Sequence, residues 1–244
     1  MSDLSWLSRT TLLVGKKGIE KLQNAHVLVI GLGGVGSYAA EAIARSGVGK
    51  MTIVDGDTVD PTNRNRQLPA LSSTHGLYKA DLMHQRLLDV NPDLELTSMK
   101  TFLTPDKVEE ILENKYSYIV DAIDSLTPKV TLLSTAYYKN FRIVSSMGAG
   151  GKMDPTKVQV TDIGKTKICN LAYMVRKRLR HKGVYGGIKA VYSPEPALRS
   201  SLMLTDGSNF KKSAFGTISY LPAVFGCVCA SVVIRDLVEW KEKK

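Results

Sequence analysis

A glycine-rich turn and a carboxylate after it are the first residues of the chain that point to chemistry. The run Gly31-Leu-Gly-Gly-Val-Gly36 directly follows the apolar stretch His26–Ile30 and precedes a helix-forming stretch. Glycines in such a turn let the backbone approach a phosphate, and the first N–H groups of the helix then face the anion. Asp55 closes the next apolar run, where an acid accepts hydrogen bonds from a ribose. These features predict a nucleotide site built from Gly31, Gly33, Gly34, Gly36 and Asp55.

A second group of polar residues follows Asp55 and distinguishes a bound triphosphate from a bound dinucleotide. A dinucleotide such as NAD needs only the glycine turn to bind its pyrophosphate, so these residues would have no role in a nicotinamide dehydrogenase. A triphosphate that loses pyrophosphate needs further donors, because negative charge develops on the leaving group. We therefore predict ATP and not NAD, bound additionally by Asp57, Asn63, Arg66 and Lys79.

One more carboxylate is expected beside the triphosphate. Asp124 ends the apolar run 118–124, which we interpret as a parallel strand. Ligands of such sheets bind at the carboxyl ends of the strands. Because carboxylate and phosphate oxygens are the usual ligands of Mg²⁺, Asp124 is predicted to hold Mg²⁺.

Positive charge is concentrated in the last third of the chain. The protein has 244 residues and a net charge of +10, and residues 163–194 contain eight Lys or Arg and no acid. Leu171, Val175 and Leu179 recur at helical spacing and can pack on a core, which leaves the cations for a phosphate backbone. A solvated basic face, or a non-catalytic module that binds nucleic acid or a membrane, are the alternatives. The residues predicted to bind a nucleic acid are Arg176, Lys177, Arg178, Arg180 and Lys182.

Alternating apolar runs and helix-forming stretches must position these residues. Strands are predicted at 26–30, 51–54, 94–99, 118–124, 142–146 and 158–162, and helices at 1–25, 37–45, 79–90, 105–113, 130–139, 171–179 and 222–241. A strand–helix–strand unit of this kind requires parallel strands. We predict an α/β fold with a single doubly wound, mainly parallel, Rossmann-like sheet. The C-terminal third is expected to be irregular, and residues 183–212 rich in turns.

We expect a single domain over residues 1–244. It would consist of a helical arm (1–25), a nucleotide-binding core (26–150) and a substrate- or tRNA-facing part with a closing helix (151–244). Three cysteines are too few for a disulfide framework or a four-cysteine zinc site, so we predict no zinc and a reducing, cytoplasmic compartment. The uncharged segment 214–234 is long enough to cross a bilayer, but its glycines and Pro222 favour a helix buried against the sheet.

The order of these motifs resembles that of the ubiquitin-activating-like (ThiF/MoeB-type) adenylating enzymes, which activate a carboxylate as an acyl-adenylate. The resemblance implies that Asp55 binds the ribose, that Asp124 holds Mg²⁺, and that the phosphates are bound by Asn63, Arg66 and Lys79. Ser8-Arg9-Thr10 resembles the N-terminal arm of the family, whose arginine reaches the ATP site of the neighbouring subunit. Arg9 is therefore expected to act in trans within a homodimer.

Two branches of that family compete for this sequence. Adenylyltransferases that activate the C-terminal Gly-Gly of ubiquitin-like sulfur carriers commonly have paired Cys-x-x-Cys zinc motifs, whereas this chain has only Cys227-Val-Cys229 in an apolar stretch. Residues 121–129 and 148–162, the stretch starting Tyr192-Ser-Pro-Glu195, and Pro222–Gly226 resemble the tRNA threonylcarbamoyladenosine dehydratases. We favour this second branch and keep the sulfur-carrier adenylyltransferase as the alternative.

The favoured branch implies an ATP-dependent cyclisation beside the tRNA anticodon. The threonine carboxylate attacks the α-phosphate, and the carbamoyl group then captures the acyl-adenylate, so that no protein nucleophile is needed. Cys169-Asn170 replaces the usual Asp-Pro of that branch, and we interpret Cys169 as incidental rather than as a nucleophile. The sequence leaves open whether a sulfurtransferase partner assists and whether a monovalent cation binds near the loop after Asp55.

Overall fold

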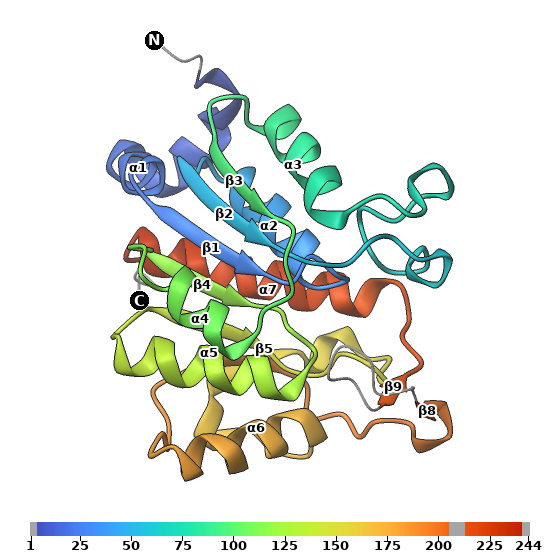
Figure 1. The fold of residues 1–244 in the computed structure, drawn as a ribbon. Helices are drawn as coiled ribbons and strands as arrows, with labels where there is room; N and C mark the ends of the chain where they lie inside the picture. The colour runs from blue at the N-terminus through green and yellow to red at the C-terminus, as the bar shows by residue number, and fades with distance from the viewer. Residues whose placement is uncertain (1–3, 205–212, 241–244) are drawn as a thin grey trace.

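A seven-stranded sheet forms the centre of the protein, and helices cover both of its faces (Figure 1). The computed structural model describes residues 4–204 and 213–240. The strands of this sheet are β1 (His26–Ile30), β2 (Lys50–Val54), β3 (Glu95–Met99), β4 (Tyr118–Asp121), β5 (Ile143–Ser146), β6 (Gln159–Asp162) and β7 (Lys189–Tyr192). The helices are α1 (Ser8–Gln23), α2 (Gly36–Ala44), α3 (Lys79–Val90), α4 (Pro105–Ile111), α5 (Leu126–Tyr138), α6 (Asn170–His181) and α7 (Tyr220–Leu237). A separate hairpin pairs β8 (Leu202–Leu204) with β9 (Ser213–Phe215).

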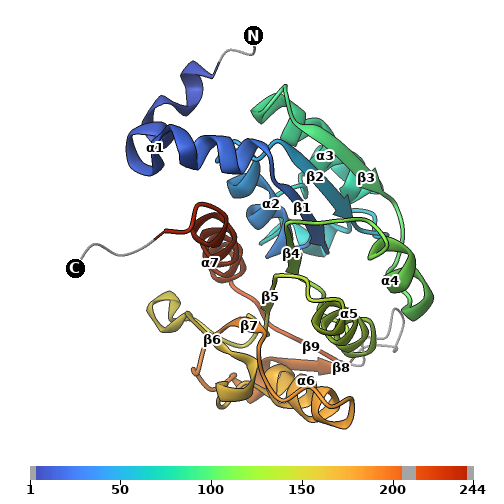
Figure 2. The same cartoon turned by 90° about the vertical axis from the view of Figure 1, so that its left-hand side faces the viewer.

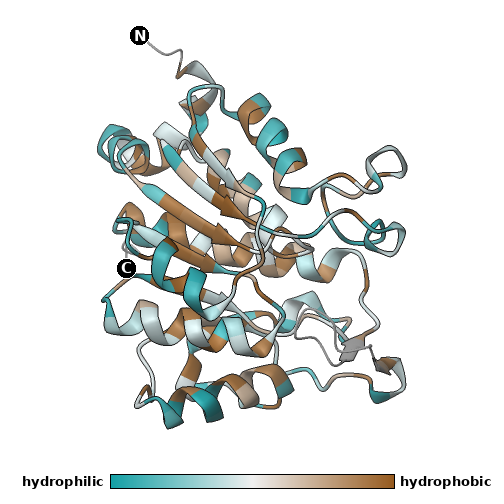
Figure 3. Ribbon diagram, in the orientation of Figure 1, coloured by the Kyte–Doolittle hydropathy of each residue, from teal (hydrophilic) through white to brown (hydrophobic). Residues whose placement is uncertain are grey.

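Burial on both faces explains why the inner strands are almost wholly apolar. Along β1, Val27 and Val29 pack into the core with α2, α3 and α7, whereas Leu28 and Ile30 pack into the core with α4, α5 and α6. This alternation follows from the two-residue repeat of a strand. Figure 2 shows the two helical layers on either side of the sheet, and in Figure 3 the hydrophobic colouring is concentrated in the central strands and α7.

The strand order fixes where a ligand can bind. The order is β3-β2-β1-β4-β5-β7-β6, and all neighbours are parallel except the edge pair β6 and β7. The chain moves outward from β1 to β2 and β3, and then returns to the other side of β1 with β4. A crevice opens at the carboxyl ends of the strands at such a switch point. The glycine turn after β1 and the loop after β4 therefore lie side by side.

The predicted α/β fold with a mainly parallel sheet is confirmed, and the differences are local. Residues 183–212 were expected to be turns, but Lys189–Tyr192 form β7, which lies inside the sheet between β5 and β6. Four residues beginning with a lysine are too short a run to show a strand period. Strand β4 ends at Asp121 and not at Asp124. Helix α5 begins at Leu126, four residues earlier than predicted, because a proline such as Pro128 is tolerated in the first turn of a helix.

The two terminal helices also differ slightly from the prediction. Helix α1 is interrupted at Gly15, whose φ of +74° is open to glycine at little cost. Helix α7 begins at Tyr220 and ends at Leu237, and the predicted end at Lys241 lies outside the described residues. Among the described helices, α7 alone is long and apolar enough to cross a membrane. It packs on α2 and on β4, β5 and β7, as expected for a core helix.

Candidate active site

The glycine turn between β1 and α2 is packed too tightly for side chains at three positions. A Cβ on Gly34 would lie 2.9 Å from the Cβ of Pro222. Gly31 has a φ of +87°, and a Cβ there would lie 2.8 Å from the carbonyl oxygen of Ala122. A Cβ on Gly36 would lie 1.7 Å from the Gly31 carbonyl oxygen. Gly33 is different, because the nearest atom to a Cβ there would be 3.7 Å away, in the side chain of Gln67. The turn thus stays open on the side from which a phosphate can approach.

Asp55 joins the glycine turn to the loop after β2. Its carboxylate accepts the N–H of Leu32 at 2.6 Å and the N–H of Asp57 at 2.8 Å. Burial raises the pKa of Asp55, and the charge of Lys79 and these two hydrogen bonds act against that rise. A carboxylate has about four acceptor positions, so two remain for the ribose hydroxyls that the sequence assigned to it.

Lys79 is brought to the same edge of the sheet by the loop that follows β2. Its side chain is buried, and Nζ donates to the Asp57 carboxylate at 3.0 Å. The backbone N–H of Lys79 donates to the Asp57 carbonyl oxygen, also at 3.0 Å. Asp57 is half exposed, so this ion pair places a carboxylate at the border of the crevice with a buried ammonium beneath it.

The polar loop at 61–67 folds back on the glycine turn. Asn63 Oδ1 accepts the N–H of Asp60 at 3.2 Å, and Arg66 donates to the Thr62 carbonyl oxygen at 3.1 Å. Asn65 ties the loop to the segment before α7 by donating to the Thr217 carbonyl oxygen at 2.9 Å.

One acceptor of this loop is buried without a partner. Gln67 Oε1 has no hydrogen bond within the described residues, and the Gln67 amide lies beside Gly33. Leaving such an acceptor unsatisfied is costly, so the position fits a hydroxyl or amino group supplied by a ligand. The open glycine turn and this acceptor together suit a nucleotide.

Asp124 lies on the exposed loop between β4 and α5, close enough to Arg66 for the two charges to interact. Burial lowers the pKa of the Arg66 guanidinium, and the Asp124 carboxylate opposes that fall. Mg²⁺ bound by phosphates needs only one or two protein carboxylates, so the residues present fit that ion. No group of three or more His, Cys, Asp or Glu side chains that could hold a metal occurs within residues 4–204 and 213–240.

A fully buried ion pair below this loop was missed by the sequence reasoning. Lys129 Nζ donates to the Asp121 carboxylate at 2.7 Å and to the Ile123 carbonyl oxygen at 2.8 Å, and neither side chain is exposed. Ser145 on β5 donates to the same carboxylate at 2.5 Å. The network fixes the backbone just before Asp124. A lysine on the apolar face of α5, eight residues after a strand-end acid, was the available signal.

A second buried lysine fixes the loop after β5. Lys152 Nζ donates to the carbonyl oxygens of Ser193, at 3.0 Å, and of Glu195. The Glu195 carboxylate accepts the N–H groups of Met153 and Asp154, both at 2.9 Å. Burial lowers the pKa of Lys152, and nearby Cys169 and Glu195 oppose that fall. Cys169 itself is buried in the apolar core beneath α6.

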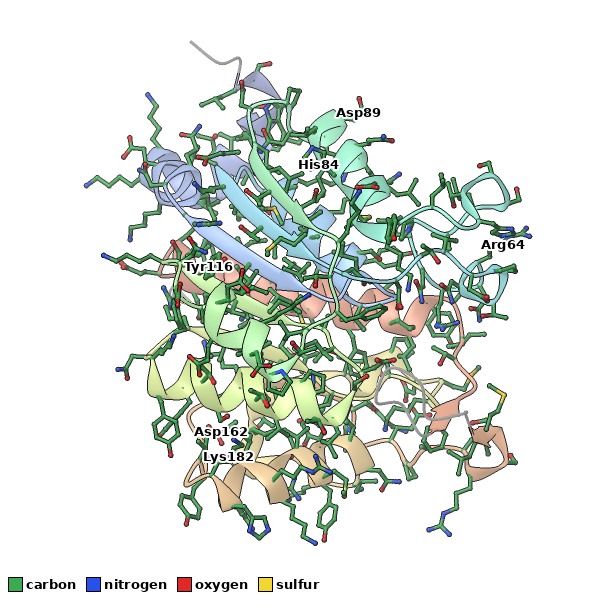
Figure 4. All side chains as sticks on the ribbon, in the orientation of Figure 1. Arg64, His84, Asp89, Tyr116, Asp162 and Lys182 are labelled. Carbon is green, nitrogen blue, oxygen red and sulfur yellow. The ribbon has the colours of Figure 1, made fainter. Side chains whose placement is uncertain are left out.

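The remaining predicted residues lie away from the crevice. Arg9 is exposed in the first turn of α1, and Figure 1 shows α1 at the edge of the sheet opposite the loops that follow β2. On α6, Ala172, Val175 and Leu179 are buried, which turns the cations outward. In Figure 4, Lys182 at the end of α6 is far from Arg64 in the 61–67 loop. The structure thus gathers the predicted ATP residues but neither Arg9 nor the cations of α6.

Known proteins resemble the chain over nearly its whole length. A tRNA threonylcarbamoyladenosine dehydratase of Bacillus subtilis is 40% identical over 243 residues, covering 97% of this chain and 96% of that protein. The solved structure of the Escherichia coli enzyme of the same name, TcdA, in complex with ATP is 38% identical with a TM-score of 0.86, covering 98% of this chain and 96% of that one.

A sulfur-transfer relative matches less of the chain. An adenylyltransferase and sulfurtransferase of Culex quinquefasciatus is 38% identical over 133 residues, which cover 54% of this chain and 30% of that protein. The sequence pattern of the ThiF family, in contrast, matches residues 7–244. The chain therefore belongs to the ThiF family.

Proposed function

We propose that the protein is an ATP-dependent tRNA threonylcarbamoyladenosine dehydratase. The observation that carries this proposal is the 40% identity, over 97% of the chain, to a relative with that name. A crevice that brings the glycine turn, Asp55, Lys79 and Asp124 together is the site such an enzyme needs. ATP bound to the similar Escherichia coli structure supports the same choice of nucleotide.

The threonine carboxylate of the modified adenosine attacks the α-phosphate of ATP, and pyrophosphate leaves. Asp55 accepts hydrogen bonds from the ribose hydroxyls. Asn63 and the backbone N–H groups from Gly33 to Gly36 bind phosphate oxygens. Arg66 and Lys79 balance the charge that grows on the pyrophosphate. The carbamoyl group then attacks the activated carbonyl carbon, a ring closes and AMP leaves, so that the base loses one water in total.

Asp124 is proposed to hold Mg²⁺ between protein and phosphates. The ion would supply further positive charge at the leaving group. Asp57 shares this border of the crevice through its ion pair with Lys79.

Arg9 is proposed to complete the site of a second subunit. Its helix lies beside the amino ends of the strands, opposite the loops that follow β2, which supports a role at the site of a neighbouring subunit. Leu12 and Leu13 on the same helix are 89% and 69% exposed, as expected of a face that another subunit covers. The dimer would then contain two shared sites.

The tRNA would contact the outward side of α6 through Arg176, Lys177, Arg178, Arg180 and Lys182. Within the described residues, none of the ion pairs takes a cation from α6, so these charges are available to phosphates. We propose that the protein acts on this substrate in the cytoplasm.

Mass analysis of nucleosides tests the proposal. Purified protein, ATP, Mg²⁺ and tRNA containing threonylcarbamoyladenosine should yield a nucleoside lighter by one water, together with AMP and pyrophosphate. An unchanged nucleoside combined with ATP consumption on a Gly-Gly-ending sulfur carrier would establish the alternative. Adding a sulfurtransferase, or exchanging the monovalent cation, tests the two helpers that the sequence leaves open.

A further inference from the structure

A hollow of about 310 Å³ lies on the outward side of α6. It is lined by Tyr173, Arg176, Lys177, Arg180 and His181. The last four of these residues lie three, four, seven and eight positions after Tyr173, so all five form one stripe along the helix. Residues 163–194 contain no acid, so the lining offers donors and one aromatic ring but no carboxylate.

Two members of the stripe are already placed for recognition. Arg176 donates to the Thr166 carbonyl oxygen at 2.6 Å and to the Thr166 hydroxyl, which fixes the guanidinium and leaves other N–H groups for a ligand. The guanidinium carbon is 6.0 Å from the centre of the Tyr173 ring. Tyr173 is 55% exposed, so its ring is accessible to a ligand.

The position of the stripe relative to the crevice limits what it can bind. The start of α6 adjoins the loop after β5, since a Cβ on Gly148 would lie 3.7 Å from Leu171 and 3.8 Å from the sulfur of Cys169. From there the helix runs back along the sheet for about 18 Å. The hollow therefore lies on the helix that leads away from the crevice, where RNA flanking the reacting nucleotide can pass.

We propose that this hollow binds one unpaired nucleotide of the RNA substrate, next to the modified one. Tyr173 stacks on the base, and Arg176 and Arg180 bind the adjoining phosphates. Proteins that bind single-stranded RNA combine an aromatic platform with nearby cations in this way. The inference rests on the proposed function, because it takes RNA as the substrate.

The test compares single-stranded and paired RNA. Binding of a mixed-sequence oligoribonucleotide, and of the same strand annealed to its complement, is measured for the wild type, Tyr173→Ala and Tyr173→Phe. Tyr185→Ala is the matched control, because Tyr185 is also exposed but lies outside the hollow. Tyr173→Ala should weaken single-strand binding about tenfold, since a base stacked on an aromatic ring contributes roughly 1–3 kcal/mol. Its salt dependence should not change, because no charge is removed.

The remaining outcomes either support or overturn the stacking site. Tyr173→Phe should bind like the wild type, and duplex affinity should be the same in all variants. Equal effects of Tyr173→Ala and Tyr185→Ala, an equal loss for duplex, or competition by polyglutamate as strong as by RNA would each overturn it. If nucleoside conversion persists when the stacking result fails, only the hollow is misassigned, whereas loss of conversion in the wild-type assay would reject the proposed function itself.

Discussion

At the scale of single residues, the proposed site consists of charged groups whose positions are fixed by hydrogen bonds and ion pairs. Asp55 is held by two backbone N–H groups, Lys79 by Asp57, and the loop of Asp124 by Lys129 below it. The sequence predicted the groups that are proposed to face the ligand, because their types and spacing are typical of nucleotide chemistry. It did not identify Lys129, because a lysine in a helix reads as a surface charge until the burial of that position is known.

Replacing Asp124 by alanine should abolish most ATP-dependent turnover without unfolding the protein. The side chain is exposed, so its removal leaves no cavity, but the triphosphate loses its carboxylate neighbour. We expect turnover to fall on the order of 100-fold, as for the loss of one group that stabilises transition-state charge. Steady-state rates and a melting curve are measured beside Glu113→Ala, another exposed acid. Wild-type turnover in Asp124→Ala would remove the residue from the site.

Replacing Lys129 by methionine should instead destabilise the fold. The Asp121 carboxylate would stay buried with its counter-charge removed, which costs about 3 kcal/mol in the free energy of unfolding. Urea denaturation measures the loss. The control is Lys139→Met, which breaks the exposed pair with Glu109 and should cost less than about 0.5 kcal/mol. Equal losses in both variants would show that burial does not set the strength of the Lys129 pair.

At the scale of elements, the order of strands and helices decides which residues can meet. Long periodic segments such as α3 and apolar runs such as β1 were predictable, because their patterns are set by which face is buried. Strand β7 was not predictable, because it owes its place to pairing with β5 and β6 rather than to its own four residues. Helix α6 was predictable from its apolar stripe, which also showed which side its cations would take.

The cations of α6 should matter for tRNA and not for ATP. Reversing two of them, in Arg176→Glu with Arg180→Glu, should weaken tRNA binding and lower its dependence on log salt by about one for each phosphate that is no longer neutralised. ATP affinity should not change, because the glycine turn lies across the sheet. Titrations at several salt concentrations measure both, with Lys115→Glu and Lys139→Glu, outside α6, as the charge-matched control. An unaltered tRNA affinity and slope would make α6 a solvated face.

At the scale of the whole molecule, helix α1, which carries Arg9, lies beside the amino ends of the strands, opposite the loops proposed to bind ATP (Figure 1). The common direction of the strands explains this placement, because the loops that follow β1, β2 and β4 all start at the carboxyl ends, whereas α1 precedes β1 and lies beside the amino ends. Nothing in the sequence alone separates an arginine that serves its own chain from one that serves a neighbour. Here the position of α1 supports the proposal that Arg9 serves the ATP site of a second subunit.

Two inactive variants should therefore restore activity when mixed. In a hybrid dimer of Arg9→Ala and Lys79→Ala chains, one site has both defects and the other has neither. Equal mixtures that exchange subunits freely should recover about a quarter of the wild-type rate, since half of the dimers are hybrids. Exchange is followed with differently tagged chains. Complete absence of rescue among chains that do exchange would contradict a shared site.

Transfer of a heavy oxygen isotope tests most directly whether the substrate carboxylate is adenylated. The threonine carboxylate of the substrate tRNA is labelled, the purified protein converts it with ATP, and the phosphate products are analysed by mass spectrometry. Attack on the α-phosphate predicts that the label leaves the base in AMP, with unlabelled pyrophosphate. Label found in inorganic phosphate, with ADP as the other product, would contradict the adenylation assigned to this crevice.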